Sequence, residues 1–340
     1  MIVSVAGNPA IDKLFEVDAV RAGEIHRPDA FIPLPGGKGI HVAQVATALG
    51  AEAIATGILA GHHGRWLSET LAAEGVPGVF AWAQSGETRS CLTVADRATG
   101  GLTEFYEDGV KASPQDWAEL AHIVDELLAR GPTWLAMAGS VPAAEGVEGY
   151  AGLVRAARAA GVRSAVDSRG GDLVRAIEQQ PDLVKINAYE ATELLGGEVQ
   201  DVPAALDGAR EIRRCAGGDG RAGGDGREGG DGHAVIITLG EQGMVLIDPE
   251  GNSWHGALAV HGNYPVGSGD AFLAGLLTAL SADESADPSA DPAAAWPEAA
   301  RLALGAAAAN AEIPGAARLD PARARELAAQ AELRALGSAT

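Results

Sequence analysis

Cysteine, aromatic residues and basic residues are all scarce in this chain of 340 residues. The two cysteines, Cys91 and Cys215, are too few for a disulfide framework or a thiolate metal site. Aromatic residues make up only 4%, so Ala, Val, Leu and Ile must build most of the core. The chain has 25 basic and 46 acidic side chains, so its formal net charge is −21. Such a charge repels phosphate backbones and acidic membrane surfaces, which argues against nucleic-acid and membrane partners.

Long hydrophobic runs are also missing. The apolar stretch Ala271–Leu280 has about half of the roughly 20 residues that a membrane span needs. The first residues, Met1–Ala6, carry no basic segment of a signal peptide and have the composition of a buried strand. We therefore expect a soluble, cytoplasmic protein.

Short apolar runs alternate with Ala- and Leu-rich helical patterns along most of the chain. The expected strands are Ile2–Ala6, Ala53–Ile58, Trp134–Ala138, Ser164–Asp167, Leu183–Ile186 and Val235–Thr238. The expected helices between them include Val42–Leu49, Pro114–Ala129, Gly149–Ala160 and Leu173–Glu178. This alternation predicts an α/β fold with a mostly parallel central sheet that helices cover on both faces.

Four segments depart from this alternation. Extended, alternating patterns near residues 13–32 and 91–106 predict a small separate sheet, either a lid over a site or a peripheral hairpin without function. Residues 217–232, rich in Gly and Asp, cannot bury apolar surface and are expected to form a flexible loop. The Ala-, Asp- and Pro-rich residues 281–295 are expected to form a second flexible insertion.

The run Pro265–Asp270 places a glycine turn directly before an apolar helix. Such a turn leaves N–H groups of the first helical turn unpaired, and these donors at the positive end of the helix dipole form a cradle for an anion. Asp270 would sit at that cradle, where a carboxylate can take a proton from an attacking hydroxyl. A tight turn with Asp as the helix N-cap is the simpler reading, and it is the commoner one for a bare G-x-G-D.

A second glycine turn, Pro35–Ile40, also runs into a helix. It is not a Walker A loop, because Gly39 stands where Ser or Thr is required. Close approach at Gly37 would let a sugar lie against the backbone, and Lys38 would supply a charge. A solvated glycine turn fits these residues about as well.

Two further motifs follow apolar strands, where α/β proteins bind ligands. The first motif begins at Lys185. Its residues Asn187 and Glu190 could hold water around Mg²⁺, or could simply cap a helix. In the second, Gly240 and Gly243 shape a turn that could flank a nucleotide or form a plain hairpin.

Two single residues complete the candidates. Asp12 follows the first strand, where a buried carboxylate needs partners that a polyol would supply. Arg89 precedes one of the lid strands and could clamp a substrate phosphate with two hydrogen bonds, although a surface arginine is the default.

Taken together, these motifs resemble the pfkB, or ribokinase-like, sugar kinases over residues 1 to about 315. The resemblance is carried in chain order by N-P-A-I-D (8–12), G-G-K-G (36–39), N-x-x-E (187–190), T-L-G-x-x-G (238–243) and P-V-G-S-G-D (265–270). Within that family the chain is most similar to the branch of 1-phosphofructokinase and tagatose-6-phosphate kinase. The segments that support this branch are Asn8–Asp12, Glu87–Arg89, Ala138–Pro142 and Asn263–Asp270.

The resemblance implies a single ribokinase-like domain over residues 1–340, an α/β/α sandwich whose lid often contributes to a homodimer. It implies ATP and Mg²⁺ as cofactors and a sugar or sugar phosphate as substrate. The implied catalytic residues are Asp270 as the base and Gly267, Ser268 and Gly269 as the anion hole. The implied sugar contacts are Asp12, Gly37, Lys38 and His41, with Arg89 on the substrate's phosphate. The implied nucleotide contacts are Lys185, Asn187, Thr238, Gly240, Gly243 and Asn310, with Glu190 holding the metal through water.

Three departures from the family pattern bear on the substrate. His41 stands where the family usually has Asn, and Ile186 replaces a proline. The segment AAEGVEG, directly after Ala138–Pro142, carries no basic residue. The expected activity is phosphorylation of a hydroxyl on a sugar phosphate of the fructose 1-phosphate or tagatose 6-phosphate class. A kinase of an unphosphorylated sugar or nucleoside would share Asp270 without needing Arg89. A non-catalytic sugar- or nucleotide-binding protein would have no use for the base.

Overall fold

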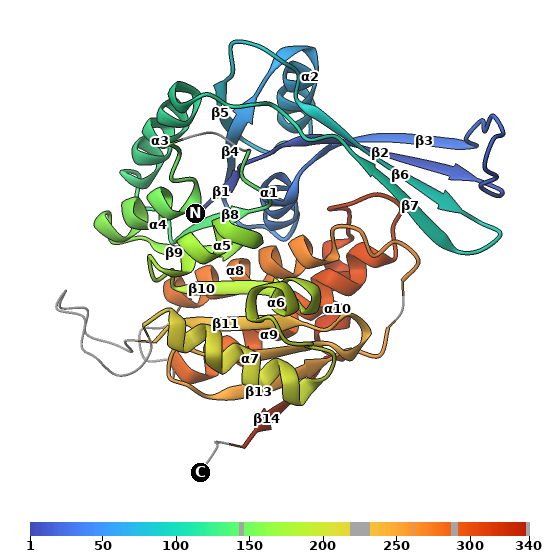
Figure 1. Ribbon diagram of the computed structural model, residues 1–340. Helices are drawn as coiled ribbons and strands as arrows, with labels where there is room; N and C mark the ends of the chain where they lie inside the picture. The colour runs from blue at the N-terminus through green and yellow to red at the C-terminus, as the bar shows by residue number, and fades with distance from the viewer. Residues whose placement is uncertain (143–145, 218–231, 261, 287–291, 338–340) are drawn as a thin grey trace.

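A computed structural model describes residues 1–142, 146–217, 232–260, 262–286 and 292–337 (Figure 1). Its main element is a sheet in the order β14-β13-β12-β11-β10-β9-β8-β1-β4-β5. The strands are β1 (Ile2–Ala6), β4 (Ala53–Leu59), β5 (Gly78–Trp82), β8 (Trp134–Ala138), β9 (Arg163–Asp167), β10 (Leu183–Asn187), β11 (Ala234–Thr238), β12 (Met244–Ile247), β13 (Ser253–Ala257) and β14 (Glu332–Leu336). Neighbours from β11 to β5 run parallel, whereas β12, β13 and β14 pair antiparallel. The predicted mostly parallel sheet is confirmed.

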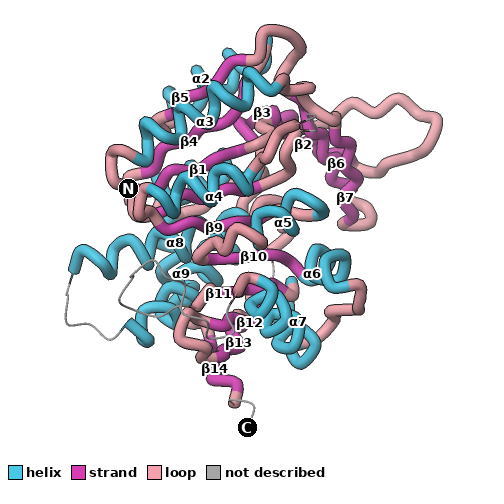
Figure 2. The backbone as a smooth tube through the Cα atoms, turned by 60° about the vertical axis from the view of Figure 1, so that its left-hand side comes forward, coloured by secondary structure: helices cyan, strands magenta, loops and turns pink. Residues whose placement is uncertain are grey.

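Helices cover both faces of this sheet (Figure 2). One layer contains α1 (Lys38–Ala48), α2 (Gly61–Ala73), α8 (Ser268–Ala286), α9 (Pro292–Ala311) and α10 (Pro321–Ala328). The other contains α3 (Pro114–Leu128), α4 (Tyr150–Ala159), α5 (Gly170–Ile177), α6 (Ala188–Leu195) and α7 (Val202–Cys215). Strand β1 shows how one sequence serves both layers, because Ile2 and Ala6 enter the first core while Val3 and Val5 enter the second.

The lid is a four-stranded sheet in the order β3-β2-β6-β7, which projects from the main body (Figure 1). Its strands are β2 (Ala10–Val17), β3 (Ala30–Gly36), β6 (Arg89–Asp96) and β7 (Gly101–Tyr106). The extended pattern expected near residues 13–32 is interrupted, because β2 ends at Val17 and β3 begins only at Ala30. Pairing begins where Ala30 lies opposite Glu16, and Ile25 is 86% exposed in the connecting loop.

The two expected insertions differ in outcome. The tract at 217–232 lies almost entirely outside the described residues. In the segment 281–295 the described residues, 281–286 and 292–295, are helical, because α8 continues to Ala286 and α9 begins at Pro292. Alanine is the strongest helix former and proline is well suited to a first helical turn, so composition favours helix here. Among the described residues, no helix is both long and apolar enough to cross a membrane.

Candidate active site

A cavity of about 560 Å³ opens at the carboxyl ends of the parallel strands, next to the lid. Its lining contains all but one of the residues singled out from the sequence. These are Asp12, Gly37, Lys38, His41, Arg89, Lys185, Asn187, Glu190, Thr238, Gly240, Gly243, Gly267, Ser268, Gly269 and Asp270. The fold therefore brings together motifs that are separated by more than 200 residues of sequence.

The loop before α8 has the geometry of an anion site. Gly267 has φ +83°, a conformation that favours glycine, and the N–H of Ser268 donates to the carbonyl of Pro265. Among the described residues, the N–H groups of Gly267 and Gly269 have no protein acceptor. A Cβ at Gly269 would lie 3.0 Å from Nζ of Lys185. Two of the three expected backbone donors are thus free for a ligand, and an ammonium group stands beside them.

Asp270 lies in the first turn of α8 and is only 6% exposed. Its Oδ2 is 2.7 Å from Nδ1 of His41, and Nε2 of the same ring is 2.9 Å from Oδ2 of Asp12. The second contact is short but bent away from the ring N–H direction, so it is an ion-pair contact more than an aligned hydrogen bond. His41 therefore joins the candidate base to the candidate sugar-binding carboxylate.

Lys38 and Lys185 meet at a carboxylate that the sequence analysis did not select. Asp167, the fully buried last residue of β9, accepts from Lys38 at 2.6 Å and from Lys185 through its other oxygen. Lys38 also contacts Glu190 at 3.0 Å. Burial alone would lower the pKa of Lys38, but the carboxylates of Asp167, Glu190 and Asp270 outweigh it and raise that pKa. Lys38 is therefore a fixed cation in the wall of the cavity, held between Asp167 and Glu190.

Asn187 and Glu190 form a reciprocal capping box at the start of α6. The side chain of Asn187 accepts from the N–H of Glu190, and the carboxylate of Glu190 accepts from the N–H of Asn187, both at 2.9 Å. No cluster of three or more His, Cys, Asp or Glu ligands occurs in the described part of the chain. These residues fit an Mg²⁺ ion that keeps its waters and binds mainly to nucleotide phosphates.

The other nucleotide candidates lie where β11 turns back into β12. Thr238 ends β11, Gly240 begins the 3₁₀ turn η1 (Gly240–Gln242) of an antiparallel hairpin, and Gly243 follows that turn. Leu304 and Ala307 of α9 add apolar side chains to the lining of the cavity. This combination suits a planar, partly apolar group.

Asn310 was expected at the edge of an adenine pocket, but it does not line the cavity. It is fully buried, and its Nδ2 donates to the carbonyl of Val266 at 2.9 Å and to Oγ of Ser268 at 3.2 Å. Asn310 thus stabilises the loop before α8 and does not itself face the cavity. No pattern near Asn310 in the sequence predicts these bonds, because the loop lies more than 40 residues earlier.

Two arginines line the cavity. Arg89 donates to the carbonyls of Asn8 at 3.2 Å and Glu107 at 3.3 Å, while its Nε has no partner among the described residues. The second, Arg169, follows β9, is exposed and also lines the cavity. The sequence analysis missed Arg169, although its place just after an expected strand end was the available signal.

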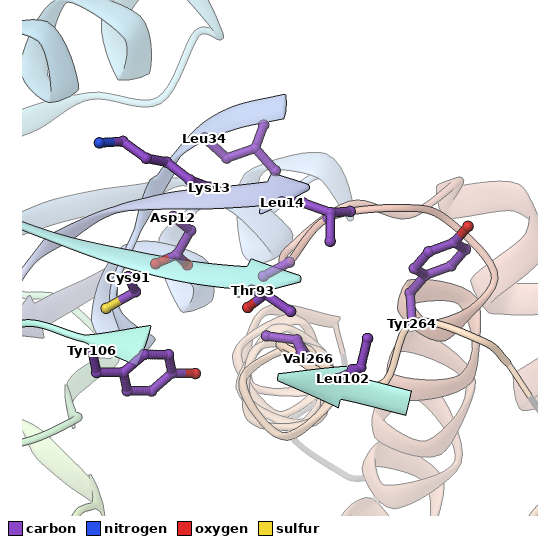
Figure 3. A pocket seen from close by; sticks show the side chains of 12 residues that line it. Asp12, Lys13, Leu14, Leu34, Cys91, Thr93, Leu102, Tyr106, Tyr264 and Val266 are labelled. Carbon is purple, nitrogen blue, oxygen red and sulfur yellow. The ribbon is translucent and has the colours of Figure 1, made fainter. Parts of the chain in front are cut away.

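The inner face of the lid forms a smaller pocket beside this cavity, seen from close by in Figure 3. Asp12 and Cys91 point into it from β2 and β6, whereas Lys13 points away, as strand alternation requires. Tyr106, Leu102 and Val266 complete its mainly apolar wall. Burial raises the pKa of Cys91 to about 12, so it remains a neutral thiol. The lid thus places one carboxylate, that of Asp12, in a mainly apolar pocket.

Comparison with known proteins identifies the family. The family described as pfkB family carbohydrate kinase matches residues 5–323. The chain is 31% identical to 1-phosphofructokinase of Rhodobacter capsulatus over 282 residues, which cover 82% of this chain and 83% of that protein. It is 30% identical to 1-phosphofructokinase of Haloferax volcanii over 280 residues, covering 82% and 84%.

Solved structures agree with this assignment. The tetrameric inhibited form of phosphofructokinase-2 from Escherichia coli superimposes with a TM-score of 0.80 at 25% identity, covering 96% of this chain and 98% of that one. A structure described as a possible 1-phosphofructokinase from Thermotoga maritima gives 0.79 at 20% identity, covering 99% and 100%, and supports the fold alone. The chain therefore belongs to the pfkB family of carbohydrate kinases and is an ATP-dependent sugar kinase.

Proposed function

We propose that this kinase transfers the γ-phosphoryl group of ATP to a hydroxyl of a sugar phosphate, in the class of fructose 1-phosphate or tagatose 6-phosphate. The observation that carries this proposal is the meeting of Asp270, the free N–H groups before α8 and two separate groups of cations around one cavity. The 1-phosphofructokinases that match over most of the chain support the same substrate class.

In this reaction Asp270 is the general base. Oδ2 contacts His41, so Oδ1 is the oxygen left to accept the proton of the attacking hydroxyl. The N–H groups of Gly267 and Gly269, with the ammonium of Lys185, neutralise charge that develops on the transferred group. The proton passes to Asp270 as the bond between the acceptor oxygen and the γ-phosphorus forms and the bond from that phosphorus to the departing ADP breaks.

Magnesium would lie near Glu190, held through water, and would supply charge neutralisation of the nucleotide phosphates. This chain's own contribution is the fixed position of Lys38 and Lys185 against Asp167. These two lysines orient the nucleotide while Thr238, Gly240 and Gly243 flank its base end.

Arg89 and Arg169 support a phosphorylated acceptor over a free sugar. An unphosphorylated polyol needs neutral or acidic partners such as Asp12, and it gains nothing from two arginines. Arg169 provides the cation that is missing after Ala138–Pro142. Ser168 donates to the carbonyl of Gly139 at 2.9 Å, which joins the segment of Arg169 to the AGSVP segment. A kinase of a free sugar remains the second candidate.

The outer face of the lid is suited to form the interface of a homodimer. This face carries Phe15, Phe31, Leu92, Val94 and Phe105, of which Phe31 and Phe105 are 53% and 59% exposed. A second copy of the chain packed on this face would remove these rings from water. Sedimentation of the pure protein would test this, and a monomer at micromolar concentration would contradict it.

Two measurements test the activity. A coupled ADP-release assay over ketohexoses, their monophosphates and nucleosides should give the highest kcat/KM with a ketohexose monophosphate. With that substrate, Asp270→Asn should keep ATP and sugar binding and lower kcat by roughly 10²–10⁴-fold, the range for a positioned base. Near-wild-type turnover of Asp270→Asn would remove Asp270 from the mechanism, and a preference for free sugars would favour the second candidate.

A further inference from the structure

His41 lies in the first turn of α1 and is only 4% exposed. Both of its ring nitrogens contact carboxylates, Nδ1 that of Asp270 at 2.7 Å and Nε2 that of Asp12 at 2.9 Å. A neutral imidazole has one N–H group and one lone pair, so it would turn a lone pair toward one of the two carboxylates. Only the imidazolium ion has an N–H group on both sides of the ring and a positive charge between the two carboxylates.

The surroundings of the ring contain few other charges. Strands β1, β3, β4 and β8 pack against α1 and carry no ionisable acid or base, and α1 itself contributes only Lys38. Helix α8 contributes Asp270 in the turn that faces the ring, and its two other acids follow 13 and 14 residues later. Burial alone would lower the pKa of His41, but the contacts with Asp12 and Asp270 outweigh it and raise that pKa to about 10.

We propose that His41 is a positioning residue that, as an imidazolium ion, clamps Oδ2 of Asp270 and keeps this carboxylate ionised and pointed at the acceptor hydroxyl. The proposal rests on the role of Asp270 given above. An asparagine, the usual residue at this position in the resembling family, could donate a hydrogen bond but would bring no positive charge. This chain has therefore added an electrostatic function at that position.

The link also reaches the lid. Asp12 belongs to β2 of the lid, and Asp270 belongs to the helix that starts at the anion loop. A single buried ring touches both, so the acceptor's binding carboxylate and its base are held in one rigid unit. Without the imidazolium, two carboxylates would share one site, and like charges raise the pKa of such a pair.

The first test is a direct measurement of the ring. In ¹⁵N-labelled protein, one histidine should show the nitrogen shifts of an imidazolium at pH 8, and that signal should vanish in His41→Asn. In Asp12→Asn the same ring should lose its proton at a lower pH than in the wild type. A neutral His41 ring in the wild type at pH 8 overturns the proposal, whatever the activity of Asp270→Asn.

The second test separates positioning from mere structure. In His41→Asn the acidic limb of the kcat/KM profile should move up by roughly 1–3 pH units, the effect of removing a cation beside a carboxylate. This limb belongs to the Asp12–Asp270 pair and not to one residue. His122→Asn, the same change at an exposed histidine of α3, should leave the profile in place. A loss of activity in His41→Asn that is equal at all pH values would overturn the proposal.

The two tests keep this inference distinct from the catalytic role of Asp270. If Asp270→Asn retains full turnover while the ring of His41 is an imidazolium, the base assignment fails and the clamp remains as a structural contact only. If Asp270→Asn is inactive while the ring is neutral, the base stands and the clamp fails. Should His41→Asn not fold, the ring measurements on the wild type and on Asp12→Asn still decide.

Discussion

Asp167→Asn should destabilise the folded protein. Asp167 is fully buried and faces two ammonium groups, those of Lys38 and Lys185. The amide of asparagine is nearly isosteric but carries no charge, so the variant leaves both lysines without this partner. Breaking a buried ion pair from one side costs about 3–5 kcal/mol, because the remaining charge stays desolvated.

The position of each lysine sets the expected value within that range. The side chain of Lys38 is 33% exposed and keeps Glu190, so its charge can be partly resolvated. The side chain of Lys185 is only 3% exposed and has no second acidic partner among the described residues. The unpaired ammonium group of Lys185 therefore dominates the effect. We expect the free energy of unfolding to fall by about 3 kcal/mol, near the lower end of the range. With a denaturation slope near 3 kcal/mol/M, the urea midpoint should fall by about 1 M.

The pH dependence of this difference follows from the pKa of Asp167. Burial alone would raise this pKa, but Lys185 and Lys38 outweigh it and hold it below the ordinary value. A carboxylate whose folded-state pKa is depressed contributes stability above its unfolded pKa of about 3.9 and loses it as the pH falls through the folded pKa. The difference in free energy of unfolding between the wild type and Asp167→Asn should therefore persist from pH 5 to 8 and become smaller below about pH 4.

Urea unfolding followed by circular dichroism checks this prediction. Asp207→Asn is the matched control, because its carboxylate is 78% exposed and pairs only with Arg210 on the surface. That control should change stability by less than about 1 kcal/mol. Equal midpoints for Asp167→Asn and the wild type at pH 7 would refute the reasoning, since a buried charge would then have lost its partner at no cost.

Two further predictions concern the acceptor end and the glycine-rich tract. Arg89→Ala and Arg169→Ala should each raise the KM for the sugar phosphate by on the order of tenfold to a hundredfold while the KM for ATP barely moves, because a charge-assisted bond to phosphate contributes roughly 1.5–3 kcal/mol. Arg65→Ala, an exposed change on α2, is their control, and unchanged KM values in both cavity variants would favour a free-sugar substrate. Replacing residues 217–232 by a short Gly/Ser linker should leave folding and kcat nearly unchanged, and a large loss of activity would show that the tract contributes to the site.

The sequence predicted the central sheet well, because its strands are buried on both faces and appear as short apolar runs. Strands β1, β8 and β11 are examples in which almost every residue is buried. The edge strand β14 has no such run, since its residues are exposed or half-buried and its pairing with β13 is set only by the tertiary fold. The pattern of burial, more than intrinsic strand preference, thus decided which elements could be predicted.

The candidate site was predictable where a motif is local and was missed where contacts cross the chain. The glycine turn before Asp270 and the capping pair Asn187–Glu190 are readable from neighbouring residues. The partners of Asp167 are not, because Lys38 lies 129 positions away in the sequence. The contacts of Asn310 could not be predicted for the same reason, because its hydrogen bonds to the loop before α8 depend on how α9 packs against α8.

Charge balance around the cavity distinguishes its two ends. On the nucleotide side, Lys38 and Lys185 are matched by Asp167 and Glu190, so the four charges cancel. In the proposed reaction these lysines would be held in place by their carboxylates, and most of the extra positive charge for the nucleotide phosphates would come from Mg²⁺. On the acceptor side, Arg89 is anchored by carbonyl oxygens alone, and Arg169 has no acidic partner among the described residues. Their full charges remain for an anionic acceptor that enters without a metal ion, in a protein whose overall charge of −21 would otherwise repel it.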